Sequence, residues 1–172
     1  LDARLTAQDG LYRLVGTVFP GDIVQGIGAR ALGREVGIEA EGTLAAAVVQ
    51  GDFTLDGAGL DLSGTGGIDL ADKEWRDLRL VGLVDDPELL GTGLRLADAR
   101  VEALLDGPIG ALRVPHSITV GRLQTGNVVF ANLTQRGVLT ARNGQLVLPL
   151  AARVARVSSG LAEADRRLGR TG

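Results

Sequence analysis

The chain has 172 residues, and its 18 basic residues against 21 acidic ones give a formal net charge of −3. This balance argues against a dedicated nucleic-acid-binding protein, because phosphate contacts need a basic surface. Cysteine is absent, which excludes disulfides and thiolate chemistry, and the single histidine excludes a metal site built from several histidines.

Glycine is abundant, with 26 residues, whereas aromatic residues make up only 3% and apolar residues 45% of the chain. The apolar content is therefore Leu, Val, Ile and Ala, which is unlike a compact enzyme that buries large rings. No run of 18 apolar residues is present, so no membrane-spanning helix is expected. Because methionine is absent and the first residue is Leu1, we expect an internal piece of a longer protein.

Alternation of apolar and polar residues recurs along the chain and predicts strands. It begins at residues 1–8, is most regular from Gly59 to Leu70, and returns at 77–80, 98–105, 118–133 and 146–150. Asp-Gly or Asn-Gly pairs at Asp9, Asp56, Asp106 and Asn143 predict hairpin turns or strand junctions between these runs. Residues 43–50 fit a helix or a strand equally well.

Helical patterns are few and short. We expect one or two turns of helix within Gly21–Gly33, a single turn within Asp85–Gly93 with Pro87 at its first position, and a helix in 158–169. No break in composition marks a second domain. The sequence therefore predicts one all-β segment over residues 1–172 with one or two short helical insertions.

The feature that points to a function is spread over many strands, because each carries aliphatic residues on one face and polar residues on the other. These faces either close on each other as two packed sheets or line an open trough formed by one curling sheet. The residues expected to line such a trough are Leu60, Leu62, Ile68, Leu70, Leu78, Leu80, Val101, Leu105, Ile118, Val120, Leu146, Leu148 and Leu150.

Residues with catalytic chemistry do not form a recognisable set. His116 follows Pro115, and we expect it at the surface near a strand end. The acidic residues Asp85, Asp86 and Glu88 fit the start of a helix, where the helix dipole favours negative charge. We therefore expect no enzyme, no catalytic residues, no metal and no cofactor. The locally basic stretch from Arg153 to Arg170 is expected to be a solvated end.

Two phrases carry a resemblance to a known family: LDGPIGALRV, from Leu105, and LTARNGQLVLPL, from Leu139. With the strand rhythm of residues 51–160, they resemble the AsmA-like group of bacterial envelope proteins, in particular the TamB-like translocation and assembly module proteins. The resemblance implies an elongated, curled antiparallel sheet, folded like a taco, with an open hydrophobic groove. It supplies no catalytic residues.

The resemblance also implies a location and partners. Proteins of this group lie in the periplasm of Gram-negative bacteria, are anchored in the inner membrane by a segment outside this chain, and act with an Omp85-type outer-membrane barrel. They are associated with phospholipid transport between the two membranes and with outer-membrane protein assembly. The sequence leaves open whether the cargo is phospholipid or an extended polypeptide. It also leaves open a structural or adhesive β-scaffold with a closed, dry core and no cargo.

Overall fold

The computed structural model describes residues 2–20, 26–111, 113–142, 145–147 and 151–159, with only the backbone at 141, 142, 145 and 146. These residues form eleven strands, one α-helix and one 3-10 turn. In chain order the elements are β1 (Asp2–Gln8), β2 (Leu11–Val18), α1 (Ile27–Leu32), β3 (Val36–Ala45), β4 (Val48–Asp56), β5 (Leu60–Asp69), β6 (Glu74–Val84), β7 (Leu94–Pro108), η2 (Ile109–Ala111), β8 (Arg113–Thr125), β9 (Val128–Arg142), β10 (Gln145–Val147) and β11 (Ala152–Ser158).

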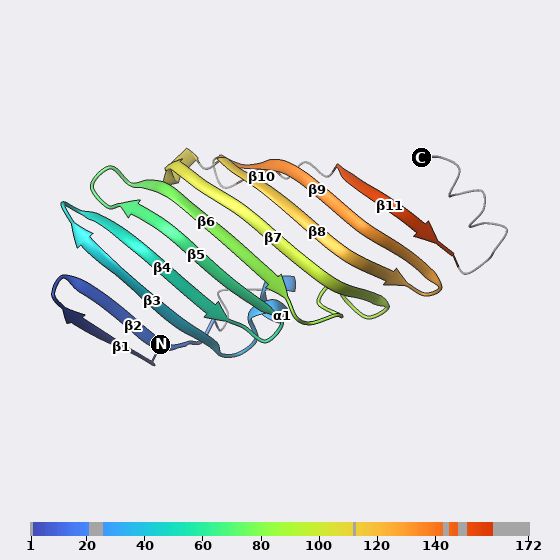
Figure 1. The fold of residues 1–172 in the computed structure, drawn as a ribbon, viewed down its shortest axis with the longest axis horizontal. Helices are drawn as coiled ribbons and strands as arrows, with labels where there is room; N and C mark the ends of the chain where they lie inside the picture. Colours follow the sequence, from blue (N-terminus) through green and yellow to red (C-terminus); the bar gives the residue numbers. More distant parts are fainter. Residues whose placement is uncertain (1, 21–25, 112, 143–144, 148–150, 160–172) are drawn as a thin grey trace.

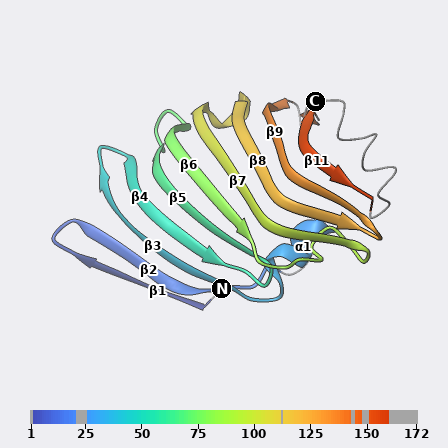
Figure 2. The ribbon, with the colours of Figure 1, turned by 45° about the vertical axis from the view of Figure 1, so that its right-hand side comes forward.

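All eleven strands belong to one antiparallel sheet whose order follows the chain (Figure 1). The far edge of β9 is shared by β10 and β11, so the sheet is ten strands wide and does not close on itself. Its strands curve along their length, as Figure 2 shows. Within the described residues, extensive contacts between strands join sheet neighbours only, so no second sheet packs against this one. The predicted all-β, curled antiparallel sheet is confirmed.

The pairing register separates two faces of the sheet. Leu62, Gly82, Val101 and Ile118 are directly opposite one another on β5 to β8, and the neighbouring row is Asp61, Leu83, Arg100 and Thr119. Successive side chains of a strand point to opposite faces, so the first row belongs to an apolar face and the second to a mainly polar one. We call these the trough face and the outer face.

A β-bulge in β6 changes which residues face the trough. Asp77, with a φ of 49°, is an extra residue relative to both β5 and β7. Trp75 and Leu78 therefore share the trough face although they are three residues apart. The backbone N–H of Asp77 donates a hydrogen bond to Oδ1 of Asp106 at 3.3 Å.

A second irregularity crosses four strands as a line. Asp98, Gly121, Asn132 and Ala155 are opposite one another on β7, β8, β9 and β11, and each is skipped by the regular pairing. Asp98 and Asn132 have φ values of 54° and 52°, in the left-handed region. The alternation is reset at this line, so apolar residues on both sides of it face the trough: Leu96 and Ala99 on β7, Val120 and Leu123 on β8, Phe130 and Leu133 on β9, and Val154 and Val157 on β11.

The small buried core lies at one end of the trough face. Ala31 of α1 and Leu89 of the segment before β7 pack with Leu96 and Ala99, and Leu60, Val84, Val120 and Leu123 surround them. Arg30 of the helix donates through Nη1 to the backbone oxygens of Glu88 and Leu89 at 3.3 and 3.1 Å. Helix and segment together therefore cover one end of the trough face.

The expectations for local structure had mixed outcomes. The turn at Asp9 and Gly10 is confirmed, with φ values of 51° and 80°. Residues 43–50 form a hairpin in which Ala46 and Ala47 have positive φ. The one-turn helix within 85–93 is wrong: the segment forms turns, and the N–H of Leu96 bonds to the oxygen of Pro87 at 2.7 Å, which folds the segment back onto β7. The one or two turns of helix expected within 21–33 are confirmed as α1, Ile27–Leu32, within the described residues. The turn at Asn143 and most of the predicted helix of 158–169 lie outside the described residues.

The turn between β5 and β6 is organised by a buried carboxylate. Oδ1 of Asp69 accepts hydrogen bonds from the backbone N–H groups of Ala71 and Asp72, each at 3.0 Å, and Oδ2 pairs with Arg76. The Asp72 amide contributes most to lowering the pKa of Asp69 below its usual value, and the Arg76 hydrogen bond comes next. The charged form of Asp69 therefore stabilises the folded state.

Substitution Asp69→Asn is expected to lower the thermal unfolding midpoint at pH 7, because the amide cannot pair with Arg76. A carboxylate with a lowered pKa stabilises the fold above its unfolded-state pKa, here 3.8, and loses this effect as the pH falls toward the folded-state value. The difference between wild type and variant should therefore shrink below pH 3.8, as thermal unfolding at several pH values will show. Asp72→Asn is the control, because its 3.9 Å pair with Arg76 is exposed. An Asp69→Asn difference independent of pH would contradict this account.

Substitution Asn132→Val is expected to destabilise the fold by about 1–2 kcal/mol, because a β-branched residue is strained in the left-handed region. Asn132→Gly, which removes the side chain without this strain, should stay within about 0.5 kcal/mol of wild type. Urea unfolding of the two variants provides the comparison. Equal loss of stability in both would show that the Asn132 side chain, not the backbone conformation, stabilises the line across the sheet.

Candidate apolar trough

The structure brings most of the predicted trough residues onto one face. Nine of them occupy the trough face by register: Leu60, Leu62, Ile68, Leu78, Leu80, Val101, Leu105, Ile118 and Val120. Leu70 lies one residue beyond the end of β5, in the turn, and is 52% exposed. Leu146 belongs to β10 and pairs with Ala141, whereas Leu148 and Leu150 lie outside the described residues. Their role as a lining for lipid stays a prediction.

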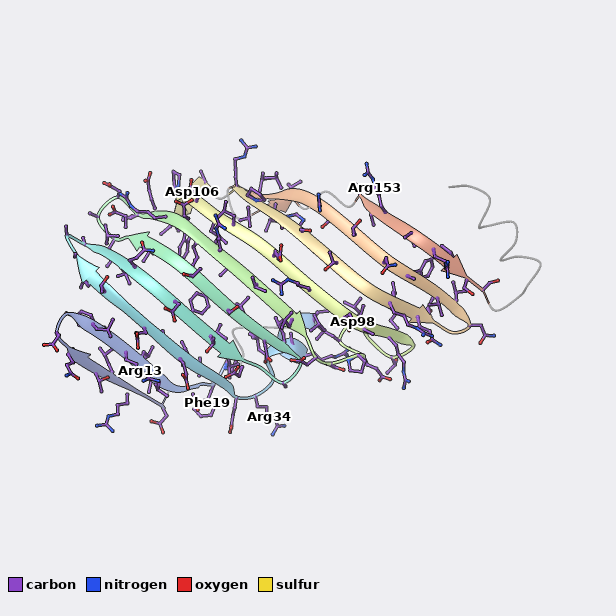
Figure 3. All side chains as sticks on the ribbon, viewed as in Figure 1. Arg13, Phe19, Arg34, Asp98, Asp106 and Arg153 are labelled. Carbon is purple, nitrogen blue, oxygen red and sulfur yellow. The ribbon has the colours of Figure 1, made fainter. Side chains whose placement is uncertain are left out.

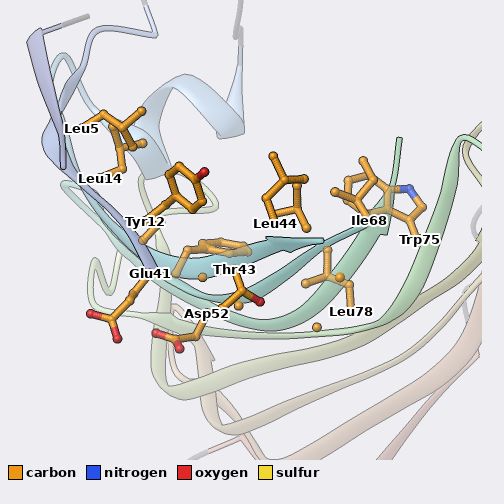
Figure 4. Close-up of a pocket in the computed structure, with 17 residues that line it drawn as sticks. Leu5, Tyr12, Leu14, Glu41, Thr43, Leu44, Asp52, Ile68, Trp75 and Leu78 are labelled. Carbon is orange, nitrogen blue, oxygen red and sulfur yellow. The ribbon is translucent and has the colours of Figure 1, made fainter. Parts of the chain in front are cut away.

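A cavity of the trough face lies over β1 to β6, mostly in a region that the sequence prediction left out. It has a volume of about 370 Å³. Leu5, Tyr12 and Leu14 form one side, and Ile68, Trp75 and Leu78 lie across the cavity from them (Figure 4). The side chains of Glu41 and Asp52 extend to the other side of the sheet. The alternation in residues 1–8 predicted β1. Trp75 could not be placed on the trough face from the sequence, because the bulge at Asp77 shifts the alternation between Trp75 and Leu78.

Aromatic residues are concentrated in this cavity. The chain has one Trp, one Tyr and three Phe, and Tyr12, Phe53 and Trp75 all line the cavity. They belong to β2, β4 and β6, and the glycine-containing strands β3 and β5 lie between these three strands. Large rings therefore alternate with strands that carry small residues, which leaves room between the rings.

The floor of the cavity is bare backbone. Gly42, Gly51 and Gly66 are opposite one another on β3, β4 and β5, next to Tyr12 of β2. A Cβ atom at Gly51 would lie 2.1 Å from the oxygen of Glu41 and 2.7 Å from Cα of Gly42. The strands thus approach too closely here for any side chain, and the glycine row permits the bend that hollows the trough.

The trough face remains open to solvent over much of its area. No large side chain within the described ranges is fully buried, and Leu5, Leu44 and Val49 are 64%, 49% and 36% exposed. Monomeric soluble proteins rarely expose apolar area on this scale unless it binds something. The trough face is therefore an exposed apolar surface and not a finished core.

Two polar side chains interrupt the trough face. His116 lies within β8, opposite Ala103 and Gly137, and is half-buried, so the expectation of a surface position at a strand end is wrong. Pro115 does not end the strand, which runs on to Thr125. His116 Nδ1 lies 3.3 Å from the oxygen of Val114, and Nε2 is buried without a hydrogen-bond partner in the described part of the chain. Gln135 of β9 is the diagonal neighbour of His116 and is buried.

Other kinds of site find little support in the described residues. No group of three His, Cys, Asp or Glu side chains is placed to hold a metal ion there. No helix in the described ranges is long and apolar enough to cross a membrane. Comparisons of the chain with models of protein families, with curated proteins and with solved structures find no match.

Substitution Gly51→Ala is expected to destabilise the fold by about 1–3 kcal/mol, because the new methyl group overlaps backbone atoms of β3 and the strands must separate. Gly110→Ala is the control: it has no heavy atom within 4 Å of the added Cβ and its φ is not positive. Chemical denaturation compares the two variants. A wild-type-like stability of Gly51→Ala would contradict the close strand approach at the trough floor.

Proposed function

We propose that this chain is a trough segment that shields the acyl chains of phospholipids in a bacterial cell envelope. The observation that carries the proposal is a single curled sheet whose apolar face, over the described residues, is covered only at one end by α1 and residues 85–93. A structural scaffold with a closed, dry core would need a second layer over this face, and the described residues supply none.

The energetics of lipid transfer fit such a surface. Exposing an acyl chain of about 16 carbons to water costs on the order of 12 kcal/mol, at roughly 0.8 kcal/mol for each methylene. An aliphatic wall offsets this cost through burial of apolar area, which needs no directed contacts. Few polar groups interrupt the wall, so the free energy of a bound chain would vary little with its position.

The backbone hydrogen bonding favours lipid over an extended polypeptide as the occupant of the trough. Within the described sheet, β2 to β9 pair with neighbours on both sides, so the trough floor offers few free N–H or C=O groups. A polypeptide lying there would bury its own backbone groups without partners, which costs free energy for each group. An acyl chain has no such groups. An extended polypeptide would instead pair with an open sheet edge, such as β1.

The resemblance of residues 51–160 to the TamB-like proteins supports the same function and extends the proposal to the setting. A periplasmic location, an inner-membrane anchor outside this chain and an Omp85-type partner are parts of the proposal that come from this resemblance. The curled, open sheet is the fold that the resemblance implies, and many unrelated functions share a fold, so the trough surface carries the argument.

Substitution Leu44→Asp is expected to reduce co-purifying phospholipid several-fold and to weaken binding of a fluorescent fatty acid, because it places a charge on the trough face. Leu44 is 49% exposed, so the fold should tolerate the change. Leu83→Asp is the matched control, since Leu83 is 44% exposed but lies on the outer face. Native mass spectrometry and thin-layer chromatography of the purified chain measure the bound lipid.

Two outcomes would overturn the proposal. Wild-type protein that carries no lipid and does not bind the fatty acid would favour the scaffold. Equal loss of lipid in Leu44→Asp and Leu83→Asp would show that the trough face has no special part in binding.

A further inference from the structure

Acidic and basic residues are segregated along the chain even though their totals nearly balance. Residues 35–72 contain eight Asp and Glu and no Lys or Arg, whereas residues 107–160 contain six Arg and no Asp or Glu. Because the strand order follows the chain, the structure places the acidic stretch on β3 to β5 and the basic stretch on β8 to β11. The sheet is therefore polarised along its long axis.

The basic stretch forms a surface that we call the basic end. Five of its arginines are exposed and belong to the outer face by register, and Figure 3 shows Arg153 among them on the last strand. None of the five lies within 4.0 Å of a carboxylate in the described part of the chain. They are Arg113, Arg122, Arg136, Arg153 and Arg156.

The residues between these arginines are also hydrogen-bond donors. Thr119, Thr134 and Arg153 are opposite one another across β8, β9 and β11, and Ser117 is opposite Arg136. Guanidinium groups bind phosphate through two parallel N–H bonds, and hydroxyl groups add further donors. The five arginines with Ser117, Thr119 and Thr134 form a donor-rich surface on β8, β9 and β11, bordered on β7 by Glu102, which pairs with Arg100 at 2.8 Å. Such a surface fits a phosphate-bearing partner.

The acidic stretch of the same chain cannot neutralise the basic end. Even the nearest strands of the two stretches, β5 and β8, are three positions apart, which is about 14 Å at a strand spacing of about 4.8 Å. Charges interact weakly over that distance, because the screening length at physiological salt is about 8 Å. Burial, followed by the nearby Asp85 and Asp56, raises the pKa of Asp61, as expected where acidic groups lie together without cations.

The edge at the basic end combines charge with exposed apolar side chains. On β11, Arg153 and Arg156 belong to the outer face, whereas Val154, 39% exposed, and Val157 belong to the trough face. Val147 on β10 is 59% exposed at the same side of β9. The edge thus offers arginines to lipid phosphates and valines to acyl chains, whereas an acidic protein would use only the arginines, which favours a bilayer.

We infer that the basic end docks on the surface of an anionic phospholipid bilayer while the acidic stretch is repelled from it. The long axis of the sheet then points away from the membrane, and the trough opens at the bilayer beside β11. The functional role of this docking rests on the proposed function, because docking brings the trough to the bilayer that would supply its acyl chains. The electrostatic contact itself is independent of trough binding.

The test is co-sedimentation of the purified chain with phosphatidylcholine vesicles, with and without phosphatidylglycerol, at low and high salt. We expect binding only to vesicles with phosphatidylglycerol, weakened by salt. The triple variant R136E/R153E/R156E should bind at least about tenfold more weakly, because each Arg contributes to attraction by an anionic surface. The control R4E/R13E/R34E carries the same change in net charge near the acidic stretch and should bind like wild type.

Each other outcome counts against the inference. Equal binding to neutral vesicles, or equal loss of binding in both triple variants, would overturn it. Salt-sensitive dimers without vesicle binding would show that a second copy of the chain covers the basic end. The Leu44→Asp variant separates this contact from the proposed function: it should lose bound lipid but keep its vesicle binding, whereas failure of fatty-acid binding in wild type would affect the trough proposal alone.

Discussion

One-sided burial is the constraint on which the rest of this structure depends. Strand alternation gives each strand one apolar and one polar face, and a single sheet has nothing to place against the apolar face except itself. The sheet responds by curving and by covering one end of the trough face with α1 and the Leu89 segment. Most of the apolar face remains accessible, as the exposure of Leu5 and Leu44 shows. The proposed function and the incomplete burial are therefore two aspects of the same arrangement.

The irregular positions preserve this one-sidedness where regular alternation would lose it. Beyond Ala99, uninterrupted alternation along β7 would turn Leu96 toward the outer face, and the left-handed residue Asp98 turns it back. Asn132 does the same for Phe130 on β9. Asp77 restores Trp75 to the trough face on β6. Each position costs backbone strain or a ladder hydrogen bond, which the packing of apolar side chains on the correct face offsets.

These positions also explain how far sequence reasoning reached. Alternation alone identified β1, β5 and parts of β6 to β9, and placed residues such as Leu62, Val101 and Ile118 on one face, because period two is a direct property of extended backbone. It did not identify β2, β4 or β11. It missed Trp75 and Leu123, since a bulge or a left-handed residue changes parity without changing composition. Asp and Asn are tolerant of positive φ, so Asp98 and Asn132 carried a signal, but many Asp and Asn residues occur in ordinary turns. The aromatic cavity was missed because it depends on the cross-strand register of β2, β4 and β6.

The two faces also differ in how specific their contacts can be. Under the proposed function, the trough face acts through apolar area, which does not distinguish one aliphatic ligand from another and suits cargo that moves. In the inferred docking, the outer face acts through charge. Acidic residues on β3–β5 and basic residues on β8–β11 make one end of the sheet different from the other, which a uniformly apolar surface does not do. A protein that handles apolar cargo without directed contacts needs some other feature to set its orientation. In this chain the polarised outer face could set that orientation. The same strand alternation that places the leucines on the trough face places the arginines on the outer face.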